Sequence, residues 1–476
     1  MLRRTKIVAT VGPATDDVAV LTDMMRAGVD VVRLNASHGT LEDRRRRLAL
    51  VREAAHRANK CAGVLLDLAG PKIRIEGFRD GKVILREGQA FALDTNLDPK
   101  GGTGEVVGCA YKDLPKDVAA GDTLLLNDGQ IVLDVERVGG ARIDTRVRIG
   151  GELSDRKGLN RQGGGISAPA LSDKDKEDIR FAVEENVDYI AVSFARDAGD
   201  IEQARTLARR AGRETRIVAK VERQEAINNL SQIVEASDVV MVARGDLGVE
   251  MGYAELTGLQ KTIIHQTRLK NRVVITATQM MESMIQNPIP TRAEVSDVAN
   301  AVMDGTDAVM LSAETAAGRY PVRAVEAMAQ VIEGAEKYQL AHNRERHRTE
   351  GQFRDSEEAI AMAVMYAANH MRVRAIVALT ESGSTPLWMS RIRSDIPIYA
   401  FTRHEATRRR VTLFRGVYPV IFDVTRAKST GELYDTLFTR LLELKLVERN
   451  DLVILTKGEL SGVQGGTNSL QILEVA

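Results

Sequence analysis

The segment TRIVAKVERQEAINNLSQIVEASDVVMVARGDLG, residues 215–248, contains the pattern that decides the fold. Two short apolar runs rich in Val and Ala, at 215–222 and 237–243, flank a longer stretch with helical character. Strands that are apolar on both faces are typical of parallel sheets covered by helices. The segment therefore predicts two parallel strands joined by a helix.

The same alternation extends over much of the chain outside this segment. Eight strands are expected in all, at residues 6–12, 29–35, 62–69, 187–194, 215–222, 237–243, 272–279 and 307–314. All but one of these runs are followed by a stretch that reads as helix. Eight β-then-α units favour a closed (β/α)8 barrel, or TIM barrel, over the alternative of an open, doubly wound sheet.

The alternation breaks between the third and fourth strands, over residues 70–165. Short alternating runs at 82–94, 122–138 and 141–151 are separated there by Gly-rich turns. Such runs predict an antiparallel β-barrel domain inserted into a barrel loop. An insertion at the catalytic end of a barrel can act as a lid.

A third domain is expected after the polar stretch that follows the last barrel helix. Its strands are predicted at 374–381, 397–402, 418–423, 451–458 and 470–476, with helices between them. The domain boundaries that we predict are 1–69 and 166–344 for the catalytic barrel, 70–165 for the inserted lid, and 345–476 for a C-terminal α/β domain.

Composition indicates a soluble globular protein of the cytoplasm. The 476 residues include 66 Lys and Arg and 66 Asp and Glu, a neutral balance that predicts neither a nucleic-acid nor a membrane partner. Two cysteines, Cys61 and Cys109, are too few for a disulfide framework and suit a reducing compartment. We expect no signal peptide and no membrane helix.

Charged side chains are expected where barrel strands end, which is where such barrels carry their active sites. Lys220 and Glu222 lie two residues apart on one strand and so project from the same face, and Asp246 follows the next strand. Glu222 and Asp246 are hard oxygen ligands suited to Mg²⁺ or Mn²⁺. Polar side chains also follow the other strands: Arg33, Asn35, Ser37, His38, Asp67, Lys72, Arg74, Thr276, Thr278, Ser312 and Glu314.

These residue types favour a phosphorylated, anionic substrate, which cations such as Arg33, Arg74 and Lys220 would bind. A single charged residue at a strand end is more often a turn or capping residue, but the recurrence over six strands favours a functional site. Zinc is not expected, because no Cys/His cluster is present. No Ser–His or Cys–His pairing indicates a covalent intermediate, and no P-loop motif is present.

The chain resembles pyruvate kinases over essentially its whole length. The motifs that carry the resemblance are TKIVATVGPAT (5–15), VVRLNASHG (31–39), LLDLAGPKIR (65–74), KGLN (157–160), IVAKVER (217–223), ARGDLGVE (243–250), ITATQMMESM (275–284) and DAVMLSAETAAGRYP (307–321). The resemblance implies transfer of the phosphoryl group of phosphoenolpyruvate to ADP, giving pyruvate and ATP, the last step of glycolysis. It also implies a barrel, an inserted β lid and a C-terminal α/β domain.

The resemblance assigns roles to the residues at the strand ends. Arg33 and Lys220 would bind the phosphoryl group, and Glu222 and Asp246 would hold the divalent metal. The backbone N–H groups of Gly245 and Asp246 would bind the substrate carboxylate. Three further groups complete the assignment: Thr278, Ser312 and Glu314 for delivery of the proton, Asn35 to His38, Arg74 and Lys157 for the nucleotide, and Asn35, Ser37, Asp67 and Leu68 for K⁺.

One departure from the commonest family pattern concerns K⁺. Where many members read Asp-Thr-Lys-Gly-Pro-Glu, residues 67–72 read Asp-Leu-Ala-Gly-Pro-Lys. The ammonium group of Lys72 is close to K⁺ in size and charge and could take its place. We therefore predict activity that is independent of K⁺; the alternative is that Lys72 only pairs with a carboxylate at the barrel rim.

Regulation is expected in the C-terminal domain. The turn TESGSTP at 380–386 precedes a helix, so Ser382, Ser384 and Thr385 could hold the phosphate of a sugar-phosphate or AMP effector; an ordinary capped turn is the alternative. The resemblance also implies a homotetramer. The residues are also compatible with two other functions. One is a lyase or aldolase that handles phosphoenolpyruvate or pyruvate and would not need ADP, and the other is a non-catalytic binding protein.

Overall fold

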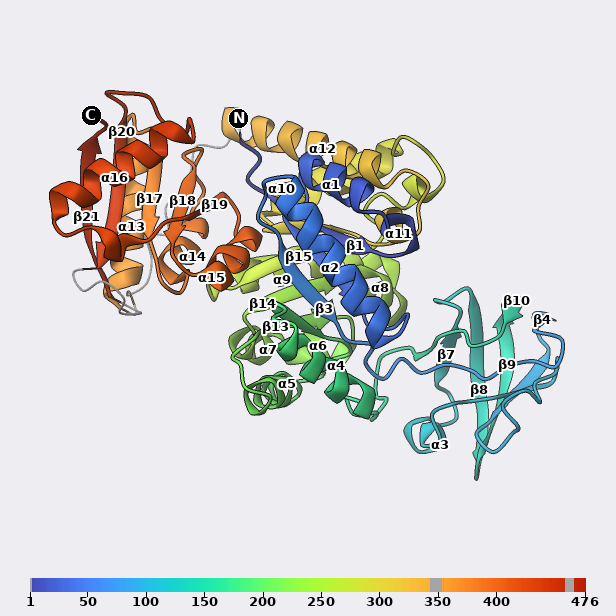
Figure 1. Ribbon diagram of the computed structural model, residues 1–476. Coiled ribbons are helices and arrows are strands. Elements are labelled where there is room, and N and C mark those ends of the chain that lie inside the picture. The colour runs from blue at the N-terminus through green and yellow to red at the C-terminus, as the bar shows by residue number, and fades with distance from the viewer. Residues whose placement is uncertain (1, 343–352, 354, 459–465) are drawn as a thin grey trace. The chain divides into compact units, whose positions relative to one another are not determined.

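The computed structural model describes residues 2–342, 353, 355–458 and 466–476 (Figure 1). The chain forms two compact units. The first comprises Met1–Leu66, Glu185–Tyr189 and Thr267–Ala476, and the second comprises Asp67–Glu184 and Ile190–Gln266. Within the described ranges, no helix has both the length and the apolar character needed to span a membrane.

Eight parallel strands close into a barrel in the order β1-β16-β15-β14-β13-β12-β3-β2, which confirms the predicted (β/α)8 fold. The strands are β1 Lys6–Val11, β2 Val31–Asn35, β3 Gly63–Asp67, β12 Tyr189–Val192, β13 Arg216–Val221, β14 Val239–Ala243, β15 Val273–Ala277 and β16 Ala308–Leu311. Nearly every strand residue is buried. All eight apolar runs are strands, because side chains covered on both faces must be apolar throughout.

Helices alternate with these strands, and several of them begin at a capping residue. Their bounds are α1 Val18–Ala27, α2 Leu41–Arg57, α4 Asp173–Glu184, α5 Ala198–Arg210, α6 Gln224–Asn228, α7 Leu230–Ala236, α8 Arg244–Met251, α9 Tyr253–Leu269, α10 Arg292–Asp304, α11 Ala313–Ala316 and α12 Pro321–His342. Thr40 and Thr291 begin α2 and α10 with reciprocal capping boxes, which satisfy backbone donors that the first turn leaves free.

An aspartate repeats at the amino end of four barrel strands. Asp30, Asp188, Asp238 and Asp307 each stand immediately before a strand, namely β2, β12, β14 and β16. Each carboxylate accepts a hydrogen bond of 2.8–3.0 Å from the backbone N–H of a residue near the start of the preceding barrel strand, namely Ile7, Val64, Ile217 and Val274. The repeat therefore fixes the register of four strand pairs with the same contact.

Each of these aspartates also has an arginine partner. Arg3 pairs with Asp30 at 2.8 Å and Arg205 with Asp238 at 2.9 Å. The partners of Asp188 and Asp307 are Arg409, at 3.1 Å, and Arg391, both from the C-terminal part of the chain. Two of the four carboxylates are thus neutralised by the C-terminal domain. We call Asp30, Asp188, Asp238 and Asp307 the floor carboxylates.

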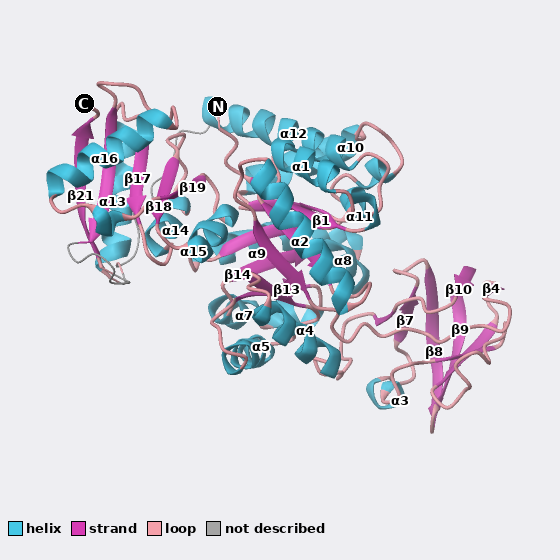
Figure 2. Cartoon of the chain, viewed as in Figure 1, coloured by secondary structure: helices cyan, strands magenta, loops and turns pink. Residues whose placement is uncertain are grey.

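The segment between β3 and α4 forms a separate sheet domain (Figure 2). A six-stranded sheet has the order β11-β7-β8-β9-β5-β6, and a two-stranded sheet pairs β10 with β4. The elements are β4 Lys82–Leu85, β5 Ala90–Asp94, β6 Val106–Gly108, α3 Leu114–Asp117, β7 Thr123–Leu126, β8 Ile131–Gly139, β9 Arg142–Ile149, β10 Gly151–Ser154 and β11 Leu159–Arg161.

The expectation of a wholly antiparallel insert is wrong at one pair. β5 and β6 pair in parallel. The connection between them is long enough to cross back, which a parallel pair requires and a tight hairpin does not allow. The three-residue strands β6 and β11 were not predicted, since runs this short carry no visible alternation.

The C-terminal domain is a five-stranded sheet in the order β19-β18-β17-β20-β21, parallel except for the last pair. Its elements are α13 Ser356–His370, β17 Ala375–Leu379, α14 Ser384–Ser390, β18 Ile398–Thr402, α15 Glu405–Arg410, β19 Val417–Ile421, α16 Thr430–Glu443, β20 Leu452–Gly458 and β21 Thr467–Glu474. All five predicted strands are present. Phe401, Leu437 and Leu455 belong to the core of this domain.

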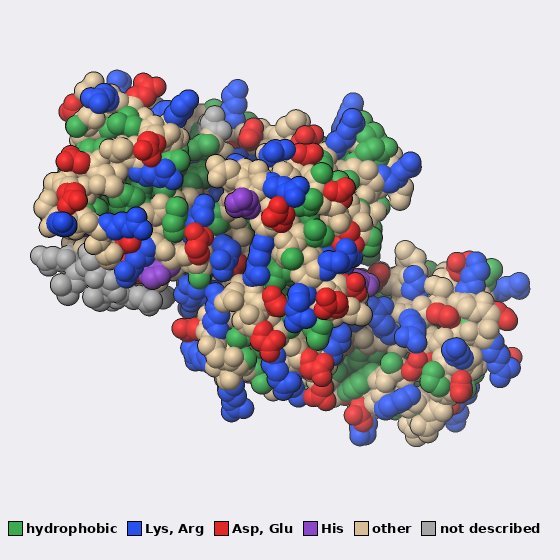
Figure 3. Space-filling model, viewed as in Figure 1, with side chains coloured by type: hydrophobic (Ala, Val, Ile, Leu, Met, Phe, Trp, Pro, Cys, Tyr) green, Lys and Arg blue, Asp and Glu red, His purple; other side chains and the backbone are tan. Residues whose placement is uncertain are grey.

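Basic and acidic side chains are interspersed over the face of the molecule in Figure 3. This distribution is what equal numbers of the two charges give when neither is gathered into one patch.

Candidate active site

The carboxyl end of β13 carries a compact charged cluster that lies wholly in the second unit. Lys220 Nζ donates to Ser193 Oγ at 2.7 Å. The same nitrogen lies 3.5 Å from Asp67 Oδ1 and 3.3 Å from Glu222 Oε2. Asp67 and Glu222 are buried, and the Lys220 side chain is 13% exposed. One cation therefore serves two buried carboxylates. Lys220 and Glu222 lie on the same side, as their spacing of two residues predicts.

Glu222 has the properties of a metal ligand. Its Oε1 accepts a hydrogen bond of 2.7 Å from the Phe194 N–H, whereas Oε2 has no hydrogen-bond partner among the described residues and forms an ion pair of 3.3 Å with Lys220. Burial raises the pKa of Glu222, Lys220 opposes that rise, and the charge of Asp246 adds to it. A buried carboxylate oxygen that lacks a donor and resists ionisation gains most from a bound cation.

Asp246 is the second candidate ligand and stands in the first turn of α8, directly after Gly245. Its Oδ1 lies 3.2 Å from Lys72 Nζ, which is also 3.8 Å from Asp128 Oδ1 in the insert. The pairing of Lys72 with a carboxylate at the barrel rim is therefore present in the structure.

Glu222 and Asp246 fit Mg²⁺ or Mn²⁺ as a pair. Within the described residues, no group of three or more His, Cys, Asp or Glu side chains is arranged to hold a metal ion. Mg²⁺ keeps several waters and commonly binds through one or two carboxylates together with substrate oxygens, so two protein ligands suffice for it.

The first unit carries the residues that follow β2. Arg33 Nη1 donates to Thr10 Oγ1 at 3.0 Å, which orients the guanidinium from the neighbouring strand β1. Asn35 Oδ1 accepts from the Ser37 N–H at 3.0 Å, so the side chain of Asn35 shapes the turn that follows β2. His38 is exposed, and its carbonyl accepts from Arg44 at 3.3 Å.

The turns after β15 and β16 are joined by Glu314. Its two oxygens accept hydrogen bonds from the Met281 N–H at 3.1 Å and from the Ser312 N–H at 2.6 Å. Burial raises the pKa of Glu314. Thr278 has a φ of 66°, which a β-branched residue adopts only when its surroundings impose it. Thr278, a predicted site residue, therefore stands in a strained turn directly after β15.

The predicted nucleotide contacts of the insert lie on adjoining segments. Arg74 forms a bridge with Gly158, and its Nη1 donates to the Arg156 carbonyl at 2.9 Å. The Lys157 carbonyl accepts from the Ile75 N–H at 3.0 Å. Arg74 and Lys157 are half-buried and are brought together by this backbone pairing.

The predicted effector residues lie at the turn between β17 and α14. Ser382 Oγ and Ser384 Oγ are 3.0 Å apart. The Thr385 hydroxyl is buried and bonded to the Thr467 hydroxyl at 2.8 Å, which gives it a structural role in the turn.

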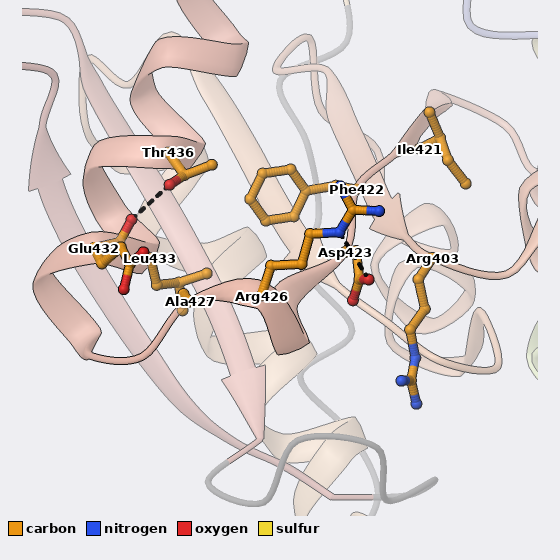
Figure 4. A pocket seen from close by; sticks show the side chains of 9 residues that line it. All are labelled: Arg403, Ile421, Phe422, Asp423, Arg426, Ala427, Glu432, Leu433 and Thr436. Carbon is orange, nitrogen blue, oxygen red and sulfur yellow. Dashed lines mark hydrogen bonds and ion pairs between the residues drawn. The ribbon is translucent and has the colours of Figure 1, made fainter.

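A cavity of about 470 Å³ lies in the same domain (Figure 4). It is lined by Arg403, which directly follows β18, and by residues of β19, α16 and the segment between those two: Ile421, Phe422, Asp423, Arg426, Ala427, Glu432, Leu433 and Thr436. None of the predicted effector residues lines it. Arg403 connects the two places, because its Nε also pairs with Glu381 at 3.3 Å in the predicted effector turn.

Ser193 and Phe194 are site residues that sequence reasoning missed. Ser193 binds Lys220, and its Oγ also lies 2.8 Å from the Leu68 carbonyl, while Phe194 donates its N–H to Glu222 at a φ of 56°. The signal for Ser193 was present, since it is the first polar residue after the apolar run of β12.

Comparison with known proteins assigns the family. The family model "Pyruvate kinase, barrel domain" matches residues 2–325, and "Pyruvate kinase, alpha/beta domain" matches 358–473. Pyruvate kinase II of Salmonella typhimurium is 54% identical, with 100% of this chain and 99% of the relative covered. Pyruvate kinase of Haemophilus influenzae is 51% identical, with 99% of each chain covered.

The structural comparison agrees. A crystal structure of a pyruvate kinase from Cryptosporidium parvum matches with a TM-score of 0.91 and 33% identity, covering 100% of this chain and 96% of the other. With the barrel, the sheet insert, the C-terminal α/β domain and the charged cluster of β13 in place, the chain belongs to the pyruvate kinase family of phosphotransferases.

Proposed function

We propose that the protein transfers the phosphoryl group of phosphoenolpyruvate to ADP, with pyruvate and ATP as products. The observation that carries the proposal is the cluster of Lys220, Asp67 and Glu222, in which a cation is held by buried carboxylates at the carboxyl end of a barrel strand. The P–O bond to the enol oxygen breaks, a P–O bond to ADP forms, and the enolate takes a proton at carbon.

Cations bind and orient the phosphoryl group in this scheme. Lys220 and Arg33 neutralise the charge that spreads over the phosphoryl oxygens in a loose transition state. Mg²⁺ or Mn²⁺, held by Glu222 and Asp246, would supply further neutralisation of phosphoryl and enolate oxygens. The backbone N–H groups of Gly245 and Asp246 at the start of α8 bind the substrate carboxylate.

Proton delivery and nucleotide binding are assigned to other residues. Thr278 lies beside the enolate carbon, and Ser312 and Glu314 belong to the network that supplies its proton. Asn35, His38, Arg74 and Lys157 contact the nucleotide, and the insert excludes water, which competes as phosphoryl acceptor. The domain boundaries 1–69 with 166–344, 70–165 and 345–476 belong to this proposal, as do a cytoplasmic location and a homotetramer.

The experiment that tests the reaction measures pyruvate formation from phosphoenolpyruvate and ADP with Mg²⁺. Turnover is expected only when ADP is present. Pyruvate release without ADP would favour a lyase, and absence of turnover with and without sugar phosphates would exclude the proposal.

K⁺ independence is the second part of the proposal. Asn35, Ser37, Asp67 and the Leu68 carbonyl match K⁺ ligands of the family, and the ammonium group of Lys72 would supply a positive charge in place of K⁺. We expect equal rates in K⁺-free buffer and with K⁺ added, and a requirement for K⁺ in Lys72→Glu. A Lys72→Glu variant that stays indifferent to K⁺ would remove this role from Lys72.

Allosteric control is the third part. A sugar phosphate or AMP would bind the turn of Ser382, Ser384 and Thr385. Arg403, which pairs with Glu381 of that turn at 3.3 Å, would supply a cation. Activation and a rise in melting temperature are expected with the effector. If neither kinetics nor melting temperature responds to saturating sugar phosphates and AMP, the site is excluded.

A further inference from the structure

Helix α8 carries three side chains that face the insert. Asp246, Val249 and Glu250 stand at positions i, i+3 and i+4 and therefore share one face of the helix. Each contacts a different part of the insert or of its connecting segments. Asp246 pairs with Lys72 in the segment that leads in, and the Glu250 carboxylate accepts from Asn160 Nδ2 at 3.5 Å in β11, the strand that leads out.

The middle contact is apolar. Val249 forms a small cluster with Leu125 of β7 and Val132 of β8, and each of the three is 8% exposed. The cluster is separate from the core of the insert, to which Leu124 and Leu126 belong. The hairpin of β7 and β8 is therefore apolar on both faces at this point, although one face of a two-sided sheet is normally polar. Contact with Val249 accounts for the additional apolar face.

The same helix is tied to the turn that follows Glu222. Glu250 Oε2 accepts a hydrogen bond of 3.1 Å from the Gln224 N–H. Lys72 adds an electrostatic connection, because it lies between Asp246 and Asp128, and Asp128 belongs to the turn of the same β7–β8 hairpin. Helix α8 thus connects the insert to both carboxylates of the metal site, Asp246 directly and Glu222 through the turn that follows it.

We propose that Val249 and Glu250 are positioning residues through which the β7–β8 hairpin of the insert orients Asp246 to bind a divalent metal ion. The apolar contact holds α8, and α8 holds Asp246. Metal affinity is therefore a property of the insert as well as of the two ligands. This inference rests on the assignment of Asp246 and Glu222 as metal ligands.

The test measures Mn²⁺ affinity of the full-length protein without substrates, from the electron paramagnetic resonance signal of free Mn²⁺. Val249→Ala and Leu125→Ala are each expected to weaken Mn²⁺ binding about three- to tenfold, which lies within the range of couplings through packed elements. The double variant is expected to be no weaker than the worse single variant, because both remove the same contact. Val249→Ile keeps the contact and is expected to retain wild-type affinity.

Val135→Ala is the matched control, since Val135 is a buried valine in the core of the insert and not in the Val249 cluster. It is expected to lower the melting temperature and leave the Mn²⁺ affinity unchanged. Wild-type affinity in Val249→Ala and Leu125→Ala, or an equal loss in Val135→Ala, would overturn the inference. Asp246→Asn reports on the assumption beneath it: if this variant binds Mn²⁺ as tightly as wild type, the metal-site assignment fails instead.

Discussion

At the residue scale, the buried carboxylate of Glu222 is expected to lower the stability of the metal-free protein and to bind the metal. Burial raises its pKa above the usual value, so the ionised form costs stability above the folded pKa, and this cost is absent at a pH below the unfolded value. In metal-free buffer at pH 8, Glu222→Gln is expected to melt at or above the wild-type temperature. Mg²⁺ is expected to raise the melting temperature of the wild type only. A variant that melts lower without metal, or gains from Mg²⁺ as the wild type does, contradicts this account.

Glu250 gives a second prediction at this scale, for a group outside the metal ligands. Burial raises its pKa from 4.5 to about 7, Arg223 opposes the rise, and Glu225 adds to it. The folded protein therefore binds an extra proton between these two values, and its stability falls as pH rises through them. The free energy of unfolding of Glu250→Gln, relative to that of the wild type, should therefore increase by about 3 kcal/mol between pH 4.5 and pH 8. Calorimetric scans across this range test it, and a difference that does not vary with pH counts against it.

At the scale of elements, the floor carboxylates fix the starts of the strands. Asp307 is almost fully buried, holds the Val274 N–H and is neutralised by Arg391, whose side chain is 5% exposed. Arg391→Met leaves a buried charge without its partner and is expected to destabilise by about 3 kcal/mol. The double change Arg391→Met with Asp307→Asn is expected to recover part of that loss. Urea titration measures the free energy of unfolding of both variants. A double variant that is less stable than the single variant would refute the pairing argument.

Arg409→Met is the matched comparison for this prediction. Its side chain is 26% exposed beside Asp188, so water can solvate the carboxylate after the change. A smaller loss of stability than in Arg391→Met is expected.

At the scale of the whole molecule, the barrel depends on the C-terminal domain. Arg391 and Arg409 neutralise two floor carboxylates, and Lys6, which is 2% exposed, donates its Nζ to the Val417 carbonyl at 2.7 Å. A chain ending at residue 342 loses all three partners at once. Its melting temperature is expected to lie about 10 °C or more below that of the full chain. This shift corresponds to a loss of stability on the order of several kcal/mol. A truncated chain that melts within a few degrees of the full one would show that the barrel is self-sufficient.

The strands of both α/β parts could be predicted because a strand covered on both faces leaves an apolar run that needs no knowledge of its neighbours. That Lys220 and Glu222 project from the same face followed from the two-residue period of a strand, and the structure shows them 3.3 Å apart. Even the floor carboxylates have a local signature, an Asp directly before an apolar run, as in VDVV at 29–32 and SDVV at 237–240. Its meaning appears only when the carboxylate meets the backbone of another strand.

The sequence by itself therefore determined the order of the elements, the family and the principal charged residues, since these depend on local periodicity and on motifs. Tertiary structure alone decided which residues far apart in the chain meet. Ser193 reaches Lys220, Lys72 lies on Asp246, and Val249 packs on Leu125 across more than a hundred residues. Thr385, predicted as a phosphate contact, bonds to Thr467 of β21. Such contacts arise from closure of the chain on itself, and no local pattern encodes which partner a side chain finds.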